Sequence, residues 1–226
     1  MLVSAYHHML ELLRPKGVEL LAVSKTKSIE EIEILYKLGQ RDFGENYVQE
    51  LLEKQAALPK DIRWHFIGHL QTNKVKYIAP FVYMIQSVDS LKLLLEIDKQ
   101  ASKIQRGIRC LFQIFIAKEE TKFGLSEPEL DSLITTVNQN RGEGQFSHSI
   151  ISGCMGMASL TENKTQIQSE FYFMHGQFEK LKKAFPSDPV KTLSMGMSSD
   201  YRIAIENGTT MVRIGSMLFG ERNYAN

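Results

Sequence analysis

The feature that most constrains this chain is a repeated alternation of short apolar runs with helical patterns. The first run, Leu20 to Ser24, is followed by Ser28, which can accept hydrogen bonds from helix amides while Glu31 reaches back as a capping box. Apolar residues then recur at helical spacing until Gly39, which stands where a helix should end. This segment predicts one strand followed by one helix.

The same order recurs to the end of the chain, so the sequence predicts eight strands in all. The other seven are expected at Asp42 to Gly44, Arg63 to Ile67, Met84 to Val88, Arg109 to Ile116, Ser147 to Gly153, Thr192 to Gly196 and Met211 to Ile214. Further helices are expected at about Leu2 to Leu13, Tyr47 to Leu58, Thr72 to Ala79, Ser90 to Ser102, Pro128 to Asn140, Thr161 to Phe185 and Asp200 to Asn207.

Strands that alternate with helices form parallel sheets, and eight such units in 226 residues predict a closed (β/α)₈ barrel of the TIM type. The helix before the first strand is an addition to that plan. No low-complexity linker or charge block divides the chain, so residues 1–226 are expected to form one domain. An open, doubly wound sheet is the competing fold.

The composition argues against several classes of protein. Lys and Arg total 27 against 26 Asp and Glu, and a net charge of +1 argues against broad contacts with nucleic acid or an anionic membrane. The apolar runs are far shorter than the ~20 residues of a membrane span, and Met1 to Pro15 lacks the pattern of a signal peptide. Cys110 and Cys154 suit a reducing compartment, and the histidines show no ligand spacing, so we expect a cytoplasmic protein without a metal.

Active sites of such barrels lie at the carboxyl ends of the strands, often with a phosphate held after strands seven and eight. The seventh strand ends in Ser194 to Ser198 and the eighth in Arg213 to Ser216, with Met217 to Phe219 as a short helix beyond. Glycine and small hydroxyl residues let backbone amides approach an anion, which indicates a phosphate site. The alternative is that Gly196 and Gly215 only permit tight turns.

Two basic residues at this end of the barrel are candidates for chemistry. Lys25 follows the first strand, where partial desolvation favours the free amine that attacks an aldehyde, but Lys27 could share its face and the pattern does not choose between them. Arg213 lies within the eighth strand and needs an anion or another acceptor, or else a structural salt bridge. Glu45 and Asn46 are expected near the mouth, as is His65, which is more typical of a satisfied core histidine.

Five ordered motifs resemble the pyridoxal 5′-phosphate (PLP) homeostasis protein family, the single-domain relatives of the alanine racemase barrel. They are Leu21 to Lys27, Phe43 to Glu50, Trp64 to Lys74, Leu193 to Ser198 and Met211 to Ser216, and the resemblance runs from Leu20 to Tyr224. It implies that Lys25, the first lysine of Val-Ser-Lys-Thr-Lys, carries PLP as a Schiff base. It further implies that Asn46 lines the pocket, Met155 flanks the ring, Arg213 faces the pyridine nitrogen, and the phosphate lies at Ser194, Ser198, Gly215 and Ser216.

The resemblance also bears on activity. An arginine at the pyridine nitrogen keeps that nitrogen unprotonated, which makes the ring a poorer electron sink. Alanine racemase adds a further domain that supplies a tyrosine as second base, whereas only Met217 to Asn226 follow the eighth strand here. We therefore expect a monomeric carrier or buffer of PLP, with apo forms of PLP-dependent enzymes as candidate recipients. A weak amino-acid racemase, or an enzyme for phosphorylated small molecules that uses no PLP, are the alternatives.

Overall fold

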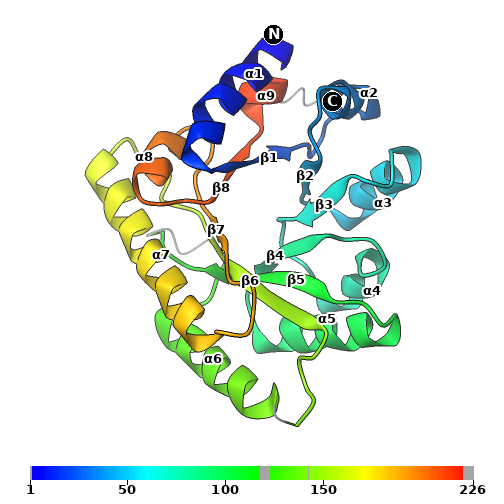
Figure 1. The fold of residues 1–226 in the computed structure, drawn as a ribbon, viewed down its shortest axis with the longest axis vertical. Helices are drawn as coiled ribbons and strands as arrows, with labels where there is room; N and C mark the ends of the chain where they lie inside the picture. The colour runs from blue at the N-terminus through cyan, green and yellow to red at the C-terminus, as the bar shows by residue number, and fades with distance from the viewer. Residues whose placement is uncertain (1, 118–122, 142, 221–226) are drawn as a thin grey trace.

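The computed structural model describes residues 2–117, 123–141 and 143–220, and eight parallel strands of that part close into a barrel in the order β1 to β8 (Figure 1). The strands are β1 Glu19–Val23, β2 Asp42–Glu45, β3 Arg63–Phe66, β4 Met84–Val88, β5 Ile108–Ile114, β6 Ser149–Gly156, β7 Thr192–Ser194 and β8 Met211–Ile214. The predicted closed barrel is confirmed, and the open doubly wound sheet is wrong. Tyr224, at the end of the family resemblance, lies outside the described residues.

Helices surround the barrel and follow the strands in turn (Figure 1). Within the described residues they are α1 Leu2–Leu13, α2 Ile29–Lys37, α3 Val48–Ala57, α4 Val75–Ile78, α5 Leu91–Lys103, α6 Glu127–Arg141, α7 Lys164–Ala184, α8 Tyr201–Glu206 and α9 Ser216–Phe219, with 3₁₀ turns η1 Arg14–Lys16 and η2 Thr72–Lys74. The expected extra helix is α1, which buries Tyr6, Met9 and Leu13. It packs beside α9, so the two ends of the described chain meet (Figure 1).

Side-chain caps account for the starts of α2, α5 and α7. Ser28 and Glu31 form the predicted capping box at the start of α2. The predicted helix from Thr161 begins three residues later, because the Asn163 side chain accepts a hydrogen bond from the Gln166 N–H and so caps α7. The predicted helix from Thr72 to Ala79 is divided between η2 and α4.

The end of β6 differs from the prediction in a way that matters for the site. Gly153 was expected to end the strand, but β6 continues to Gly156. Gly153 has a φ of +141°, and a Cβ there would lie 1.8 Å from the Thr192 carbonyl oxygen, so only glycine fits. The glycine permits an irregularity inside the strand, where the register with β5 shifts, and Met155 therefore lies on β6.

The strands separate two environments by their alternation. On β8, Val212 and Ile214 join the apolar core between barrel and helices, while Met211 and Arg213 face the barrel interior. Of the helices within the described residues, none combines the length and apolar character needed to cross a membrane. The same residues contain no cluster of three or more His, Cys, Asp or Glu side chains placed to hold a metal ion.

Candidate cofactor site

A pocket of about 320 Å³ lies at the carboxyl ends of the strands, at the end of the barrel where the sequence placed the site. Its volume falls at the lower end of the range for small-molecule sites. Seven of the eight predicted site residues line it, and they come from segments far apart in the chain: Lys25, Asn46, Met155, Ser198, Arg213, Gly215 and Ser216. Ser194 is not among the lining residues.

Lys25 is half-buried and lies on the loop between β1 and α2. Three hydrogen bonds hold the residues on either side of it. The Ser24 hydroxyl donates to Glu45 at 2.6 Å, the Ser24 carbonyl accepts from Lys54 Nζ at 2.7 Å, and the Thr26 N–H donates to Glu50 Oε1 at 2.6 Å. Because Thr26 also has a φ of +64°, the loop holds a backbone conformation that is uncommon for a β-branched residue.

Lys54 on α3 is the centre of the group that fixes this loop. Its buried ammonium lies 2.8 Å from Glu45 Oε1 and 2.6 Å from Glu50 Oε1. Burial raises the pKa of Glu45 to about 7, although Lys54 and the Ser24 hydroxyl act in the opposite direction. Sequence reasoning missed Lys54, because a glutamate four residues before a lysine on a helix usually marks an exposed pair.

Lys27, the competing lysine, also lines the pocket. Its ammonium donates to the Phe219 carbonyl oxygen at 3.2 Å and lies 3.7 Å from Glu31. These contacts hold the Lys27 side chain toward α9 and α2, and they would have to break for the amine to bond a ligand in the pocket.

Arg213 on β8 forms part of the pocket wall, and only 4% of its surface is exposed. Its guanidinium donates to the Ser194 carbonyl at 2.8 Å, to Ser194 Oγ at 2.9 Å and to the Gly156 carbonyl at 2.8 Å. Burial lowers the pKa of Arg213 to about 10, opposed by the charge of Asp200. No ion pair joins Arg213 to a carboxylate within the described residues, so the salt-bridge interpretation is wrong for this part of the chain.

The structure corrects the expected place of Ser194. The residue is fully buried in β7, where its hydroxyl donates to Gln86 Oε1 at 2.8 Å and accepts from Arg213. The strand ends at Ser194 itself and not at Gly196, so Ser194 faces the barrel interior beneath the pocket, while Ser198 lies beyond the strand and reaches the pocket. Ser194 therefore supports Arg213 and does not belong to the part of the pocket formed by Ser198, Gly215 and Ser216, which we call the cradle.

The two glycines of the predicted phosphate site differ in what requires them. Gly196 has a φ of +92°, and a Cβ there would lie 2.6 Å from the Ala204 Cβ, so packing and backbone both require glycine. A Cβ on Gly215 would make only ordinary contacts, the nearest at 3.4 Å from the Val23 carbonyl oxygen. The tight-turn explanation thus suffices for Gly196, whereas neither backbone conformation nor packing requires glycine at Gly215, which lines the pocket.

The pocket also contains an unpaired amide oxygen, a pair of hydroxyls and an apolar wall. Asn46 Oδ1 is buried and has no hydrogen-bond partner among the described residues, although Asn46 lines the pocket. A buried acceptor of this kind indicates a donor that the protein itself does not supply. Ser216 Oγ lies 3.2 Å from Ser198 Oγ, which places two hydroxyls side by side next to Gly215. Val23, Ile67 and Met155 add an apolar wall.

Comparison with known proteins agrees with this geometry. Residues 3–223 match the family model described as alanine racemase, N-terminal domain. A pyridoxal phosphate homeostasis protein of Pasteurella multocida is 40% identical over 97% of this chain and 93% of its own length, and one of Homo sapiens is 40% identical over 91% and 77%.

Solved structures show the same fold. PipY of Synechococcus elongatus, without PLP, superposes with a TM-score of 0.89 at 32% identity and covers 97% of this chain and all of its own. PipY with PLP bound gives a TM-score of 0.87. An alanine racemase of Clostridium difficile, at 16% identity and a TM-score of 0.75, is alike in fold and is matched over 57% of its length.

Fold and pocket together define a barrel of the alanine racemase N-terminal type, with a lysine after its first strand and a small-residue cradle after its last two. Within that class the relatives above are specific. The chain belongs to the pyridoxal phosphate homeostasis protein family, and the resemblance stated from the sequence motifs is confirmed.

Proposed function

We propose that this chain binds PLP as a Schiff base on Lys25, and that it carries and buffers the cofactor without turning over a substrate. The observation that supports this most strongly is a single pocket that brings Lys25 together with Gly215, Ser216 and the buried Arg213. The homeostasis proteins of other organisms and PipY with PLP bound give independent support. We propose that residues 1–226 act as one monomeric domain.

The residues of the pocket fit the parts of PLP. The Lys25 amine suits the aldehyde, while the Ser198 and Ser216 hydroxyls and the pocket wall at Gly215, which has no side chain, suit the phosphate. The unpaired Asn46 Oδ1 suits a donor on the ring, and Met155 provides an apolar contact for the ring face. When bound, PLP supplies a reactive aldehyde together with an aromatic ring that can accept electrons.

Arg213 and the ionisable residues that line the pocket favour a PLP carrier over an enzyme. A guanidinium that faces the pyridine nitrogen cannot give up its proton to it, so the ring stays a weak electron sink. Two-base racemisation also requires a second proton-transfer group across the ring. Among the described residues that line the pocket, the ionisable ones are Lys25, Lys27 and Arg213, and Lys27 already donates to the Phe219 carbonyl.

The test uses the PLP-loaded protein, its absorbance near the visible edge, and an apo form of a PLP-dependent enzyme as recipient. We expect a band that Lys25→Ala abolishes, stoichiometric release of PLP to the recipient, and no interconversion of D- and L-alanine. Racemisation that Lys27→Met abolishes would favour the alternative of a weak amino-acid racemase. A protein that develops no band with PLP would instead favour the enzyme for phosphorylated small molecules.

A further inference from the structure

The interior of this barrel contains buried polar side chains beneath the pocket. The central layers of such barrels are usually filled by branched apolar residues. Here His65 on β3, Gln86 on β4 and Ser194 on β7 are each fully buried. Neither the pocket lining nor the proposed function accounts for His65 and Gln86.

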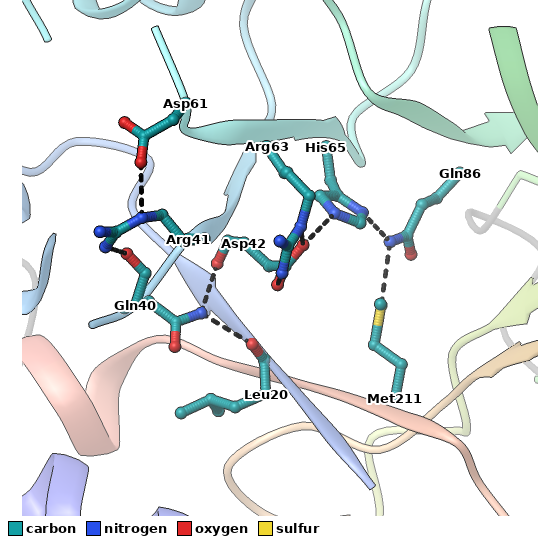
Figure 2. Close-up of polar contacts among 9 residues, drawn as sticks. All are labelled: Leu20, Gln40, Arg41, Asp42, Asp61, Arg63, His65, Gln86 and Met211. Carbon is teal, nitrogen blue, oxygen red and sulfur yellow. Dashed lines mark hydrogen bonds and ion pairs between the residues drawn. The ribbon is translucent and has the colours of Figure 1, made fainter. Parts of the chain in front are cut away.

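These side chains form one continuous hydrogen-bonded chain from the pocket to the opposite end of the barrel. Gln86 Nε2 lies 2.9 Å from His65 Nδ1, and His65 Nε2 lies 3.0 Å from Asp42 Oδ1 (Figure 2). On the other side, Ser194 Oγ donates to Gln86 Oε1 at 2.8 Å and accepts from Arg213 at 2.9 Å.

All the donors in this chain point the same way. Arg213 donates to Ser194, the Ser194 hydroxyl donates to Gln86 Oε1, and the Gln86 amide donates to His65. His65 Nδ1 is then an acceptor, so the ring hydrogen is on Nε2 and is donated to Asp42. Aligned hydrogen bonds polarise one another, so the carboxylate at the far end strengthens the bond at Arg213.

Asp42, at the far end of this hydrogen-bonded series, is held by an ion pair. Arg63 forms an ion pair with Asp42 (Figure 2). Burial alone would raise the pKa of Asp42, but hydrogen bonds from His65 and Arg63 hold it below its usual value, so the carboxyl stays ionised. Asp42, Arg63 and His65 also line a second cavity of about 460 Å³ at the amino ends of the strands.

We infer that Gln86 and His65 are positioning residues that hold the Arg213 guanidinium through Ser194. By fixing the orientation of this guanidinium, they determine the hydrogen bond that it offers to the pyridine nitrogen of the cofactor. The inference rests on the proposed binding of PLP. Within the described residues Arg213 forms no ion pair with a carboxylate, and its hydrogen bonds go to neutral oxygen atoms, so these bonds orient the guanidinium. Without Gln86 the Ser194 hydroxyl loses its acceptor and can turn away from its present alignment with Arg213.

The experiment compares Gln86→Met, Ser194→Ala and the double variant in the PLP-loaded full chain. Gln86→Met keeps the side-chain length and removes both hydrogen-bonding groups. We expect each single variant to shift the absorbance band and to weaken PLP affinity about tenfold, which corresponds to about 1.4 kcal/mol. The double variant should be no weaker than either single variant, because both break the same chain.

The matched control is Ser87→Ala, the next residue of β4. Ser87 is fully buried, and its hydroxyl has no hydrogen-bond partner among the described residues. Its band and its PLP affinity should match the wild type.

Two outcomes would overturn the inference. One is a Gln86→Met protein that melts at a lower temperature but keeps the wild-type band and affinity, which would make Gln86 merely structural. The other is additive losses in the double variant. Borohydride reduction of each protein distinguishes failure of this inference from failure of the proposed function. If reduction leaves no PLP bonded to Lys25 in the wild-type protein, the proposed function is contradicted and this inference is not.

Discussion

Replacing Lys54 by methionine is the sharpest test of how the Lys25 loop is held. The Lys54 ammonium contacts Glu45, Glu50 and the Ser24 carbonyl at 2.6 to 2.8 Å. Glu45 is fully buried, and its Oε2 already has no hydrogen-bond partner among the described residues. Lys54→Met keeps the apolar stem and leaves the Glu45 carboxylate without its counter-charge.

The expected loss in the free energy of unfolding depends on pH, because the Glu45 carboxylate can lose its charge by binding a proton. Breaking a buried ion pair by removal of one partner costs about 3–5 kcal/mol. Burial already raises the pKa of Glu45 to about 7. At pH 8 the free energy of unfolding should therefore fall by about 3 kcal/mol, and at pH 6, where Glu45 is mostly neutral in the wild type as well, by about half of that.

The measurement is urea denaturation at both pH values, with Lys92→Met as the control because Lys92 is exposed on α5. The control should change stability by less than about 0.5 kcal/mol. Adding Glu45→Gln to Lys54→Met should restore most of the loss, since no charge is then left buried. A Lys54→Met protein as stable as the control, or a double variant less stable than Lys54→Met, would refute this account of the loop.

Other predictions concern the glycines, the buried carboxyl and the buried guanidinium. Gly196→Ala should lower stability by about 2–3 kcal/mol in thermal denaturation, because its φ is +92° and its Cβ would collide with another side chain. Gly215→Ala should leave stability within about 1 kcal/mol but weaken PLP binding at least about fivefold in a titration; unchanged affinity would contradict the cradle. Because the pKa of Glu45 is raised to about 7, the native state binds the extra proton, so wild-type stability should fall by up to about 3 kcal/mol as pH rises from about 5 to 7. Glu45→Gln should flatten that slope in denaturation curves, and an unaltered slope would assign it to another group. Arg213→Glu should shift the absorbance band of bound PLP, whereas an unchanged spectrum would make Arg213 structural.

Much of the fold follows from periodicity alone. The alternation of strands and helices predicted the closed barrel, and the Ser28–Glu31 capping box marked the start of α2 correctly. The errors are at positions where a neighbour in space decides the outcome. Gly153 looks like a strand end in sequence, but β6 continues through it with a shift of register against β5, and the closeness of Thr192 leaves no room for a side chain there.

The site residues likewise divide into those that the sequence could place and those that depend on neighbours in space. Residues just beyond strand ends, such as Lys25, Ser198 and Ser216, could be placed in the pocket because the carboxyl ends of parallel strands meet. Ser194 was misplaced because the exact last residue of β7 decides whether a side chain faces the interior or the mouth. Gln86 gave no signal at all. Its role depends on a partner 108 residues away on β7, and periodicity does not show which side chains meet inside the barrel.

Borohydride reduction of the PLP-loaded protein, followed by peptide mass mapping, tests the central claim most directly. Reduction converts a Schiff base into a stable bond, so the modified lysine can be identified. We predict one pyridoxyl-phosphate group per chain on Lys25 and none on Lys27. A label found mainly on Lys27, or no labelled lysine in protein incubated with excess PLP, would contradict it.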